Sequence, residues 1–383
     1  MKVLEILRRT HWWIWLVMAL LGLSGLVFVR SATLDRPDFQ EQYGKQALFL
    51  CCSLSISILL LLPHYVKVLR LAWPIYALTV ASLALLPFFA PVINGAQRWY
   101  SFPGFSVQPS EFAKPAVVIA LAALLRFKVK ARTVEGMLVP MAVVAVPAVL
   151  ILRQPDLGSS LVLWPVLLAM CWAAGTRARG ILIVFGIGLA AAVFAYFFML
   201  HGYQRLRVEA WRDHFSWTPR SLDDPATRRV IYGAGYQPWQ ALIAMGSGGL
   251  TGFGLMRGPQ NRYDFLPYRS EDYVFAVVGE ETGWIGCASV LLLHLLLALG
   301  ILYIASRTRE RFGRLCCVGM ATWIGAQAFL HAAVCAWLIP ATGLPMPMLS
   351  YGGSSTLSAV LGVTLCLNIG ARREPVLGPD GFS

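Results

Sequence analysis

The chain has 383 residues, of which 57% are hydrophobic and 13% are charged, and it carries a formal net charge of +13. Soluble domains carry about 25% charged residues, so this chain lacks the polar surface that would cover a soluble core of its size. The composition therefore excludes an ordinary soluble protein and indicates a multi-spanning membrane protein.

Ten apolar runs have about the length of a bilayer span, which takes roughly 20 residues in a helix. They lie at residues 11–29, 46–63, 68–89, 109–125, 137–152, 159–174, 180–201, 273–305, 315–339 and 354–370. Backbone groups cannot remain unpaired in lipid, so the runs are helices or strands of a closed barrel. Because a barrel strand has only roughly 9–11 residues, we expect an all-α polytopic membrane protein with about ten transmembrane helices.

The placement of lysine and arginine predicts the orientation, because short cytoplasmic loops carry an excess of them. More than half of the 32 basic residues fall in short segments on the same side as the N-terminus. We therefore expect both chain ends in the cytoplasm. No small-residue cleavage site follows the first apolar run, which favours a signal anchor over a removable signal peptide.

One long polar segment, at about residues 202–272, is expected outside the membrane, within a single domain that covers residues 1–383. Its basic residues suit a lipid headgroup, an anionic substrate or nothing specific, and its location argues against nucleic acid as a partner. The run 239–245 is expected to dip into the membrane or to lie along its surface. The glycine-rich stretch 246–254 lets backbone approach a partner closely, unless it is only a flexible connector.

Asp272 stands where this loop meets the apolar run 273–305. Carboxylates at membrane depth are costly and usually mark a function. Burial raises the pKa of such a carboxyl toward the range of a general base, whereas a nearby helix start favours the anion. The sequence leaves open which effect dominates, and an exposed capping acid is the alternative. Glu280, about 12 Å further along a helix axis, is predicted to line the same cavity or to form an ion pair.

Two cations next to outer helix ends are candidate phosphate ligands. Arg98 precedes Trp99 in one outer segment, and Lys114 follows in the next apolar run. Either cation can pair with phosphate oxygens. Glu111, however, lies three residues before Lys114, and an ion pair on one helix face explains that pair equally well.

Further candidates lie in two other outer segments. Arg205 and Arg207 open the long loop, and Ser350 and Ser354 flank a pair of glycines. Backbone around such glycines can cradle a phosphate, although helix capping is the simpler explanation. The eight cysteines lie in apolar runs without a CxxC pair, and the six histidines show no metal-ligand spacing. The sequence therefore does not decide whether the protein binds a metal.

Five motifs in this order resemble those of the SEDS family, the bacterial peptidoglycan polymerases that include RodA, FtsW and SpoVE. The resemblance covers about residues 94–370. The motifs are Gly95-Ala96-Gln97-Arg98-Trp99, Gln108-Pro109-Ser110-Glu111 with Lys114, Gln154-Pro155-Asp156-Leu157-Gly158, Leu266-Pro267 through Asp272 to Glu280-Glu281, and Ser350-Tyr351-Gly352-Gly353-Ser354.

The resemblance implies a peptidoglycan glycosyltransferase that joins lipid II units on the outer face of the bacterial cytoplasmic membrane. Asp272 matches the family's catalytic aspartate and would act as general base in an inverting transfer. Charge then develops on the undecaprenyl pyrophosphate, so cations or a divalent metal (Mg²⁺ or Mn²⁺) must face it. The resemblance also implies a class B penicillin-binding protein as partner, besides membrane lipids.

Two residues depart from the family pattern, which commonly has glutamate where this chain has Tyr268 and threonine where it has Glu271. The motif details favour the RodA branch, for cell elongation, over the FtsW branch, for division. Two other functions remain as alternatives: a lipid II flippase or transporter, and a non-catalytic scaffold of the cell-wall synthesis complex. Against a transporter, the acids cluster at the outer face, and no inverted repeat is visible.

Overall fold

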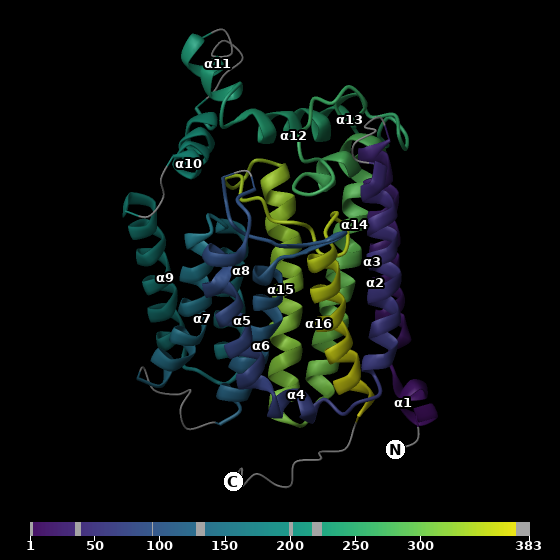
Figure 1. Ribbon diagram of the computed structural model, residues 1–383, viewed down its shortest axis with the longest axis vertical. Helices are drawn as coiled ribbons and strands as arrows, with labels where there is room; N and C mark the ends of the chain where they lie inside the picture. Colours follow the sequence, from purple (N-terminus) through teal and green to yellow (C-terminus); the bar gives the residue numbers. More distant parts are fainter. Residues whose placement is uncertain are drawn as a thin grey trace.

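The structure is a computed structural model that describes residues 3–34, 40–93, 95–127, 135–198, 202–216 and 224–372. Long helices form a bundle, and short helices and loops lie at both of its ends (Figure 1). The long helices are α2 (Trp12–Thr33), α3 (Gln40–Leu60), α5 (Ala72–Phe89), α6 (Pro109–Leu125), α7 (Glu135–Arg153), α8 (Leu157–Ala173), α9 (Ala178–Phe198), α14 (Val274–Arg307), α15 (Arg311–Cys335) and α16 (Gly353–Ala371). Every predicted span overlaps with one of these helices, which confirms the all-α polytopic fold. The last residues of the run 180–201 lie outside the described part.

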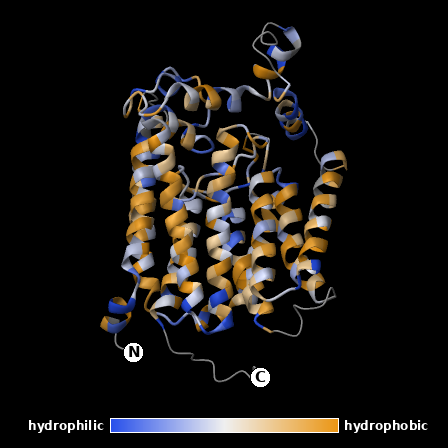
Figure 2. Ribbon diagram, turned by 180° about the vertical axis from the view of Figure 1, so that it is seen from behind, coloured by the Kyte–Doolittle hydropathy of each residue, from blue (hydrophilic) through white to orange (hydrophobic). Residues whose placement is uncertain are grey.

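The protein is a multi-pass membrane protein by the length and composition of these helices. Seven of the described helices are long and apolar enough to cross a membrane, and α8 and the first part of α9 are shorter apolar helices. Figure 2 shows hydrophobic residues along the middle of the bundle and hydrophilic residues gathered towards its two ends. Helix ends differ from the prediction where a cap decides them. Thus α15 begins before residue 315, because the Glu310 carboxylate accepts the N–H groups of Phe312 (2.7 Å) and Gly313 (2.6 Å).

The long polar loop folds largely into short helices at one end of the bundle. They are α10 (Tyr203–His214), α11 (Pro225–Ile231), α12 (Tyr236–Ser247) and α13 (Pro259–Arg262). The apolar run 239–245 lies in α12, which runs across that end of the bundle (Figure 1). Between α5 and α6 the chain forms a hairpin of β1 (Tyr100–Phe102) and β2 (Phe105–Val107). The chain termini lie at the opposite end, beside α1 (Val3–Arg9) and α4 (Val66–Arg70).

Two helices form the centre of the bundle. α15 packs against α14, α8, α6 and α16, and α6 packs against α5, α7 and α8 as well. Almost every side chain of α6 is buried, including Glu111 and Lys114. Polar groups on these helices must therefore find partners inside the protein, because an unpaired buried polar group costs several kcal/mol, of the order of 2–7.

α14 is broken at Gly283, whose φ of 65° and ψ of −161° are not helical. The glycine-rich stretch 246–254 lies directly against this break. Four backbone hydrogen bonds join the two, from Phe253 to Glu280 (3.0 Å), Gly254 to Glu281 (2.9 Å), Trp284 to Gly249 (2.9 Å) and Ile285 to Leu250 (3.2 Å). The stretch is therefore no loose connector, because it pairs backbone groups that the break takes out of the helix.

Gly248→Ala tests this close packing. A Cβ built at Gly248 would overlap the carbonyl oxygen of Gly279 in α14, whereas a Cβ at Gly246 meets no atom within 4 Å. Forcing the two backbones apart costs about 1–3 kcal/mol, so we expect a lower apparent Tm for Gly248→Ala. Gly246→Ala, inside α12, is expected to keep or slightly raise it. Thermal unfolding of the purified protein in detergent measures both, and equal values for the two variants would contradict the packing.

Candidate active site

Asp272 lies in a tight turn two residues before α14 begins. Its N–H donates to the carbonyl of Tyr268 at 2.9 Å, and Leu266 and Tyr273 on either side of the turn are buried. Arg269 ties the turn to α2, since its Nε donates to the carbonyl of Ala32 at 2.7 Å. The carboxylate is thus carried by a turn that is anchored on both sides and not by a free loop.

Gly343, in the segment between α15 and α16, lies against this carboxylate. A Cβ built on Gly343 would stand 3.4 Å from Oδ2 of Asp272, and the glycine has a φ of +66°. Residues with side chains rarely adopt this left-handed conformation. The glycine therefore has two effects: it allows the left-handed backbone conformation, and it leaves space in front of Asp272.

Two arginines and one further acid act on Asp272. Arg207, in α10, donates to the carbonyl of Ala341 (3.2 Å) and to Oε1 of Gln237 (3.3 Å). Arg98, just before β1, donates to the carbonyls of residues 154 (2.7 Å) and 155 (2.6 Å), which lie between α7 and α8. The acid is Asp156, whose carboxylate caps α8 by accepting the N–H of residue 159 at 3.0 Å. Segments far apart in the sequence thereby bring their charges together around one carboxyl group.

Burial decides the ionisation of Asp272. It raises the pKa of Asp272 to about 6, although the charges of Arg207 and then Arg98 lower this pKa and Asp156 raises it. The pKa of the adjacent Glu271 rises to about 7, first through burial and second through the charge of Asp272. Desolvation is therefore the largest influence on the pKa of Asp272.

The structure gives two of the other candidate residues internal partners. Lys114 has no exposed surface, and its Nζ lies 2.6 Å from Oε1 of Glu111 and 3.0 Å from Oε1 of Gln327. Glu280 is also fully buried, and its carboxylate accepts the N–H groups of Gln260 (2.5 Å) and Asn261 (3.1 Å) at the start of α13. In this conformation neither residue offers a surface to a substrate.

The remaining candidates are distributed over the same end of the bundle. Ser350 is buried and its hydroxyl accepts the N–H of residue 346 at 2.8 Å, whereas the half-buried Ser354 accepts the N–H of residue 108 at 3.0 Å. Arg205 is exposed and pairs with Glu209 at 3.0 Å. Trp99 is half-buried next to Arg98. Their contacts with a substrate stay predictions, and only Arg98 and Arg207 act on Asp272 among the predicted cations.

The part of the chain that the structure describes contains no cluster of side chains that would bind a resident metal. No group of three or more histidine, cysteine, aspartate or glutamate side chains there could hold a metal ion. The cations that act on Asp272 are the two arginines, Arg207 and Arg98.

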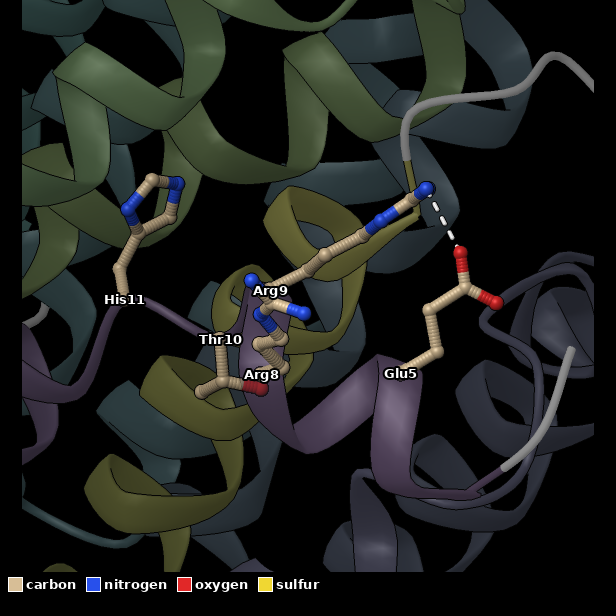
Figure 3. Close-up of a pocket in the computed structure, with 5 residues that line it drawn as sticks. All are labelled: Glu5, Arg8, Arg9, Thr10 and His11. Carbon is tan, nitrogen blue, oxygen red and sulfur yellow. Dashed lines mark ion pairs between the residues drawn. The ribbon is translucent and has the colours of Figure 1, made fainter.

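A cavity of about 450 Å³ lies at the opposite end of the bundle and is lined by Glu5, Arg8, Arg9, Thr10 and His11 (Figure 3). In it Nη2 of Arg9 pairs with Oε1 of Glu5 at 2.6 Å. The His11 ring contacts that of Tyr303 near the end of α14, whereas Asp272 precedes the start of α14. This cavity is therefore separate from the candidate site.

Comparison with known proteins identifies the family. The sequence pattern of the cell cycle proteins FtsW, RodA and SpoVE matches residues 11–374. The chain belongs to this family. The resemblance seen in the five motifs is thereby confirmed.

The relatives of the chain carry names from both branches of the family. It is 36% identical over 313 residues to a probable peptidoglycan glycosyltransferase FtsW of Geobacter metallireducens, which covers 79% of each chain. It is 30% identical over 361 residues to the peptidoglycan glycosyltransferase MrdB of Escherichia coli K12, covering 94% of this chain and 92% of MrdB. The preference for the RodA branch stays a prediction.

Solved structures share the fold. A chain from a peptidoglycan synthase complex that coordinates polymerization and crosslinking superposes with a TM-score of 0.76 at 26% identity, over 94% of this chain and 97% of that chain. The rod shape determining protein RodA of Thermus thermophilus gives a TM-score of 0.67 at 24% identity, over 96% and 98%. The second likeness shows the fold alone.

Gly343→Ala tests the space in front of Asp272, with Gly175→Ala as its control. Gly175 has a φ of +90° but no atom within 4 Å of a built Cβ, so both variants strain the backbone while only one crowds the carboxylate. We expect each to lose about 1–2 kcal/mol of stability. Only Gly343→Ala should also lower the transferase rate, by roughly tenfold or more, because small displacements at a reacting group are costly. Equal rates for the two folded variants would show that Gly343 does not matter to the site.

Proposed function

We propose that this protein, a peptidoglycan glycosyltransferase by its family and its relatives, polymerises lipid II at the end of the bundle that holds Asp272. One observation carries the proposal: a carboxyl group whose pKa is raised to about 6 is acted on by the cations Arg207 and Arg98. A general base works best with a pKa near the operating pH, and a pyrophosphate leaving group needs positive charge.

Asp272 acts as the general base of an inverting transfer. Its ionised carboxylate takes the proton from the 4-hydroxyl of the acceptor GlcNAc, and that oxygen forms a bond to the anomeric carbon of the donor MurNAc. The bond from this carbon to the undecaprenyl pyrophosphate breaks, and its electron pair leaves with the phosphate oxygen. The proton remains on Asp272 until solvent removes it. At pH 7 most Asp272 side chains are ionised, because their pKa is about 6.

Arg207 and Arg98 face the charge that develops on the leaving group. Both guanidinium groups are held by backbone carbonyls, so their positions are set before the substrate arrives. Preorganised donors of this kind are worth more than mobile ones, because they need no reorganisation during the reaction. Arg205, exposed on the same helix as Arg207, suits a more peripheral phosphate contact.

An apolar cavity of about 420 Å³ on the side of the bundle fits the lipid part of such a substrate. It is lined mainly by α5, α6 and α16, and Tyr100 and Val107 of the β1–β2 hairpin also line it. Arg98 lies two residues before Tyr100 in the same segment. A polyprenyl chain in this cavity would leave its pyrophosphate near the arginine.

We infer that the protein lies in the bacterial cytoplasmic membrane, with Asp272 outside and both chain ends inside. Arg8, Arg9 and Arg307 lie at the end that carries the termini, as an excess of basic residues on the cytoplasmic side requires. The basic residues at positions 2, 128, 130, 132 and 373 lie outside the described part. We infer that its partner is a class B penicillin-binding protein, which cross-links the strands.

Asp272→Asn separates this function from a flippase or a scaffold. The amide keeps the shape of the carboxyl group but cannot take the proton, and base catalysis contributes about 10²–10⁴-fold. We expect polymerisation of purified lipid II to fall by that factor, whereas Asp213→Asn, which changes an exposed acid of α10, keeps the wild-type rate. Polymer from a folded Asp272→Asn protein at the wild-type rate would exclude Asp272 as the base. Headgroup translocation in sealed vesicles without any polymer would favour the flippase.

The pH dependence of polymerisation reports the same group. Because Asp272 must be ionised, the wild-type rate should fall about tenfold per pH unit below pH 6. Arg207→Gln removes the largest charge that lowers this pKa, so the acid limb should move to higher pH. Glu271→Gln should leave the limb in place, since Asp272 ionises first and Glu271 responds to it. If the acid limb moved with Glu271→Gln and not with Arg207→Gln, the titrating group would be Glu271 and not Asp272.

A further inference from the structure

The segment between α15 and α16, residues 338–352, is buried backbone without regular structure. Most of its residues from Ala341 to Ser350 are buried, yet residues 339–345 form no backbone–backbone hydrogen bond in the described structure. Three prolines in the segment also remove N–H groups. Its carbonyl groups therefore need side-chain donors, because a buried carbonyl without a partner is costly.

Five side chains from four helices approach these carbonyl oxygens. They are Arg207 at Ala341 (3.2 Å), His331 at Leu344 (2.7 Å), Gln327 at Pro345 (2.7 Å), His294 at Pro347 (3.1 Å) and Gln46 at Ser350 (3.2 Å). A carbonyl only accepts, so Nδ1 of His331 carries the proton that it donates to Leu344. His294 and His331 therefore both hold this segment.

Gln327 is fixed in the orientation that this contact needs. Its Oε1 accepts from Lys114 (3.0 Å) and from the indole of Trp323 (2.7 Å), which leaves Nε2 to donate to Pro345. A flipped amide would lose all three bonds. The fully buried Lys114 thus acts on the segment through Gln327.

The segment contacts both Arg207 and Asp272 of the candidate site. The carbonyl of Ala341 holds Arg207, and Gly343 lies against the carboxylate of Asp272. Leu344, held by His331, is the next residue. A shift of this backbone would move the cation and crowd or release the base together.

We propose that His331 and Gln327 are positioning residues for the glycosyl transfer: they hold residues 341–345 where Ala341 and Gly343 set the relation of Arg207 to Asp272. The inference rests on the proposed function for its kinetic consequence. It deepens that function by assigning a role to two side chains of α15 that touch neither substrate nor base.

His331 allows a matched pair of variants. Its Nε2 has no hydrogen-bond partner among the described residues, so the bond to Leu344 is its whole contribution as a donor. Asparagine can place an amide N–H where Nδ1 stands, whereas leucine has nearly the same shape as asparagine and no donor. Thr322→Val is the control on the same helix, because the Thr322 hydroxyl bonds only back to the carbonyl of Val318 (2.8 Å).

The test measures kcat and KM for polymerisation of purified lipid II by the full-length protein, together with hydrogen–deuterium exchange of residues 341–346. We expect His331→Leu to lower kcat by about 10- to 100-fold with KM within about threefold of wild type, since misplacement of about 1 Å costs up to about 10²-fold. His331→Asn should restore kcat to within about threefold, and Thr322→Val should match wild type. Exchange should rise in His331→Leu only.

Three kinds of result overturn the inference. A folded His331→Leu protein with wild-type kcat and exchange, or equal losses in the leucine and asparagine variants, excludes a positioning role of the donor. A wild type that makes no polymer refutes the proposed function itself, and the kinetic claim with it, which separates the two failures. A change confined to KM would place His331 in substrate binding and would equally count against positioning.

Discussion

Non-helical backbone inside a membrane protein must find its hydrogen-bond partners within the protein, because lipid offers none. This protein has two such stretches close to Asp272. The glycine-rich stretch 246–254 pairs the break in α14 at Gly283 through backbone groups alone, and side chains of four helices pair the carbonyls of residues 338–352. Asp272 lies two residues before the helix whose break the first stretch pairs, and Gly343 of the second stretch lies against its carboxylate, so its position follows from both.

The same need for internal partners applies to the polar side chains that are buried inside the bundle. Lys114, Gln327 and His331 are fully buried or nearly so, and they form hydrogen bonds to other polar groups of the protein. Breaking one member of such a network leaves the others unpaired in a low dielectric, which costs more than the bond itself contributes. The network is therefore rigid, and rigidity is what a base and a cation of fixed separation require.

The helices could be predicted from the sequence, because an apolar run of about 20 residues must form a helix in lipid. The place of Asp272 could be predicted because an acid next to such a run is unusual. The role of Lys114 could not, since a phosphate ligand and a buried ion pair with Glu111 share the same spacing. The second partner of Lys114, Gln327, lies 213 residues away in the sequence. No periodic pattern predicts a contact over that distance. For Glu280 a weak signal existed: Gly258-Pro259 marks the start of α13, whose N–H groups need an acceptor.

The two departures from the family pattern fall where the structure tolerates them. Tyr268 has a φ of 51°, its side chain is 45% exposed, and its backbone carbonyl accepts the N–H groups of Glu271 (3.1 Å) and Asp272 (2.9 Å). The turn thus uses the backbone of residue 268. Glu271 has a pKa of about 7, above that of Asp272, so near neutral pH much of it is protonated while Asp272 is ionised. The extra acid therefore adds less negative charge beside Asp272 than its sequence suggests.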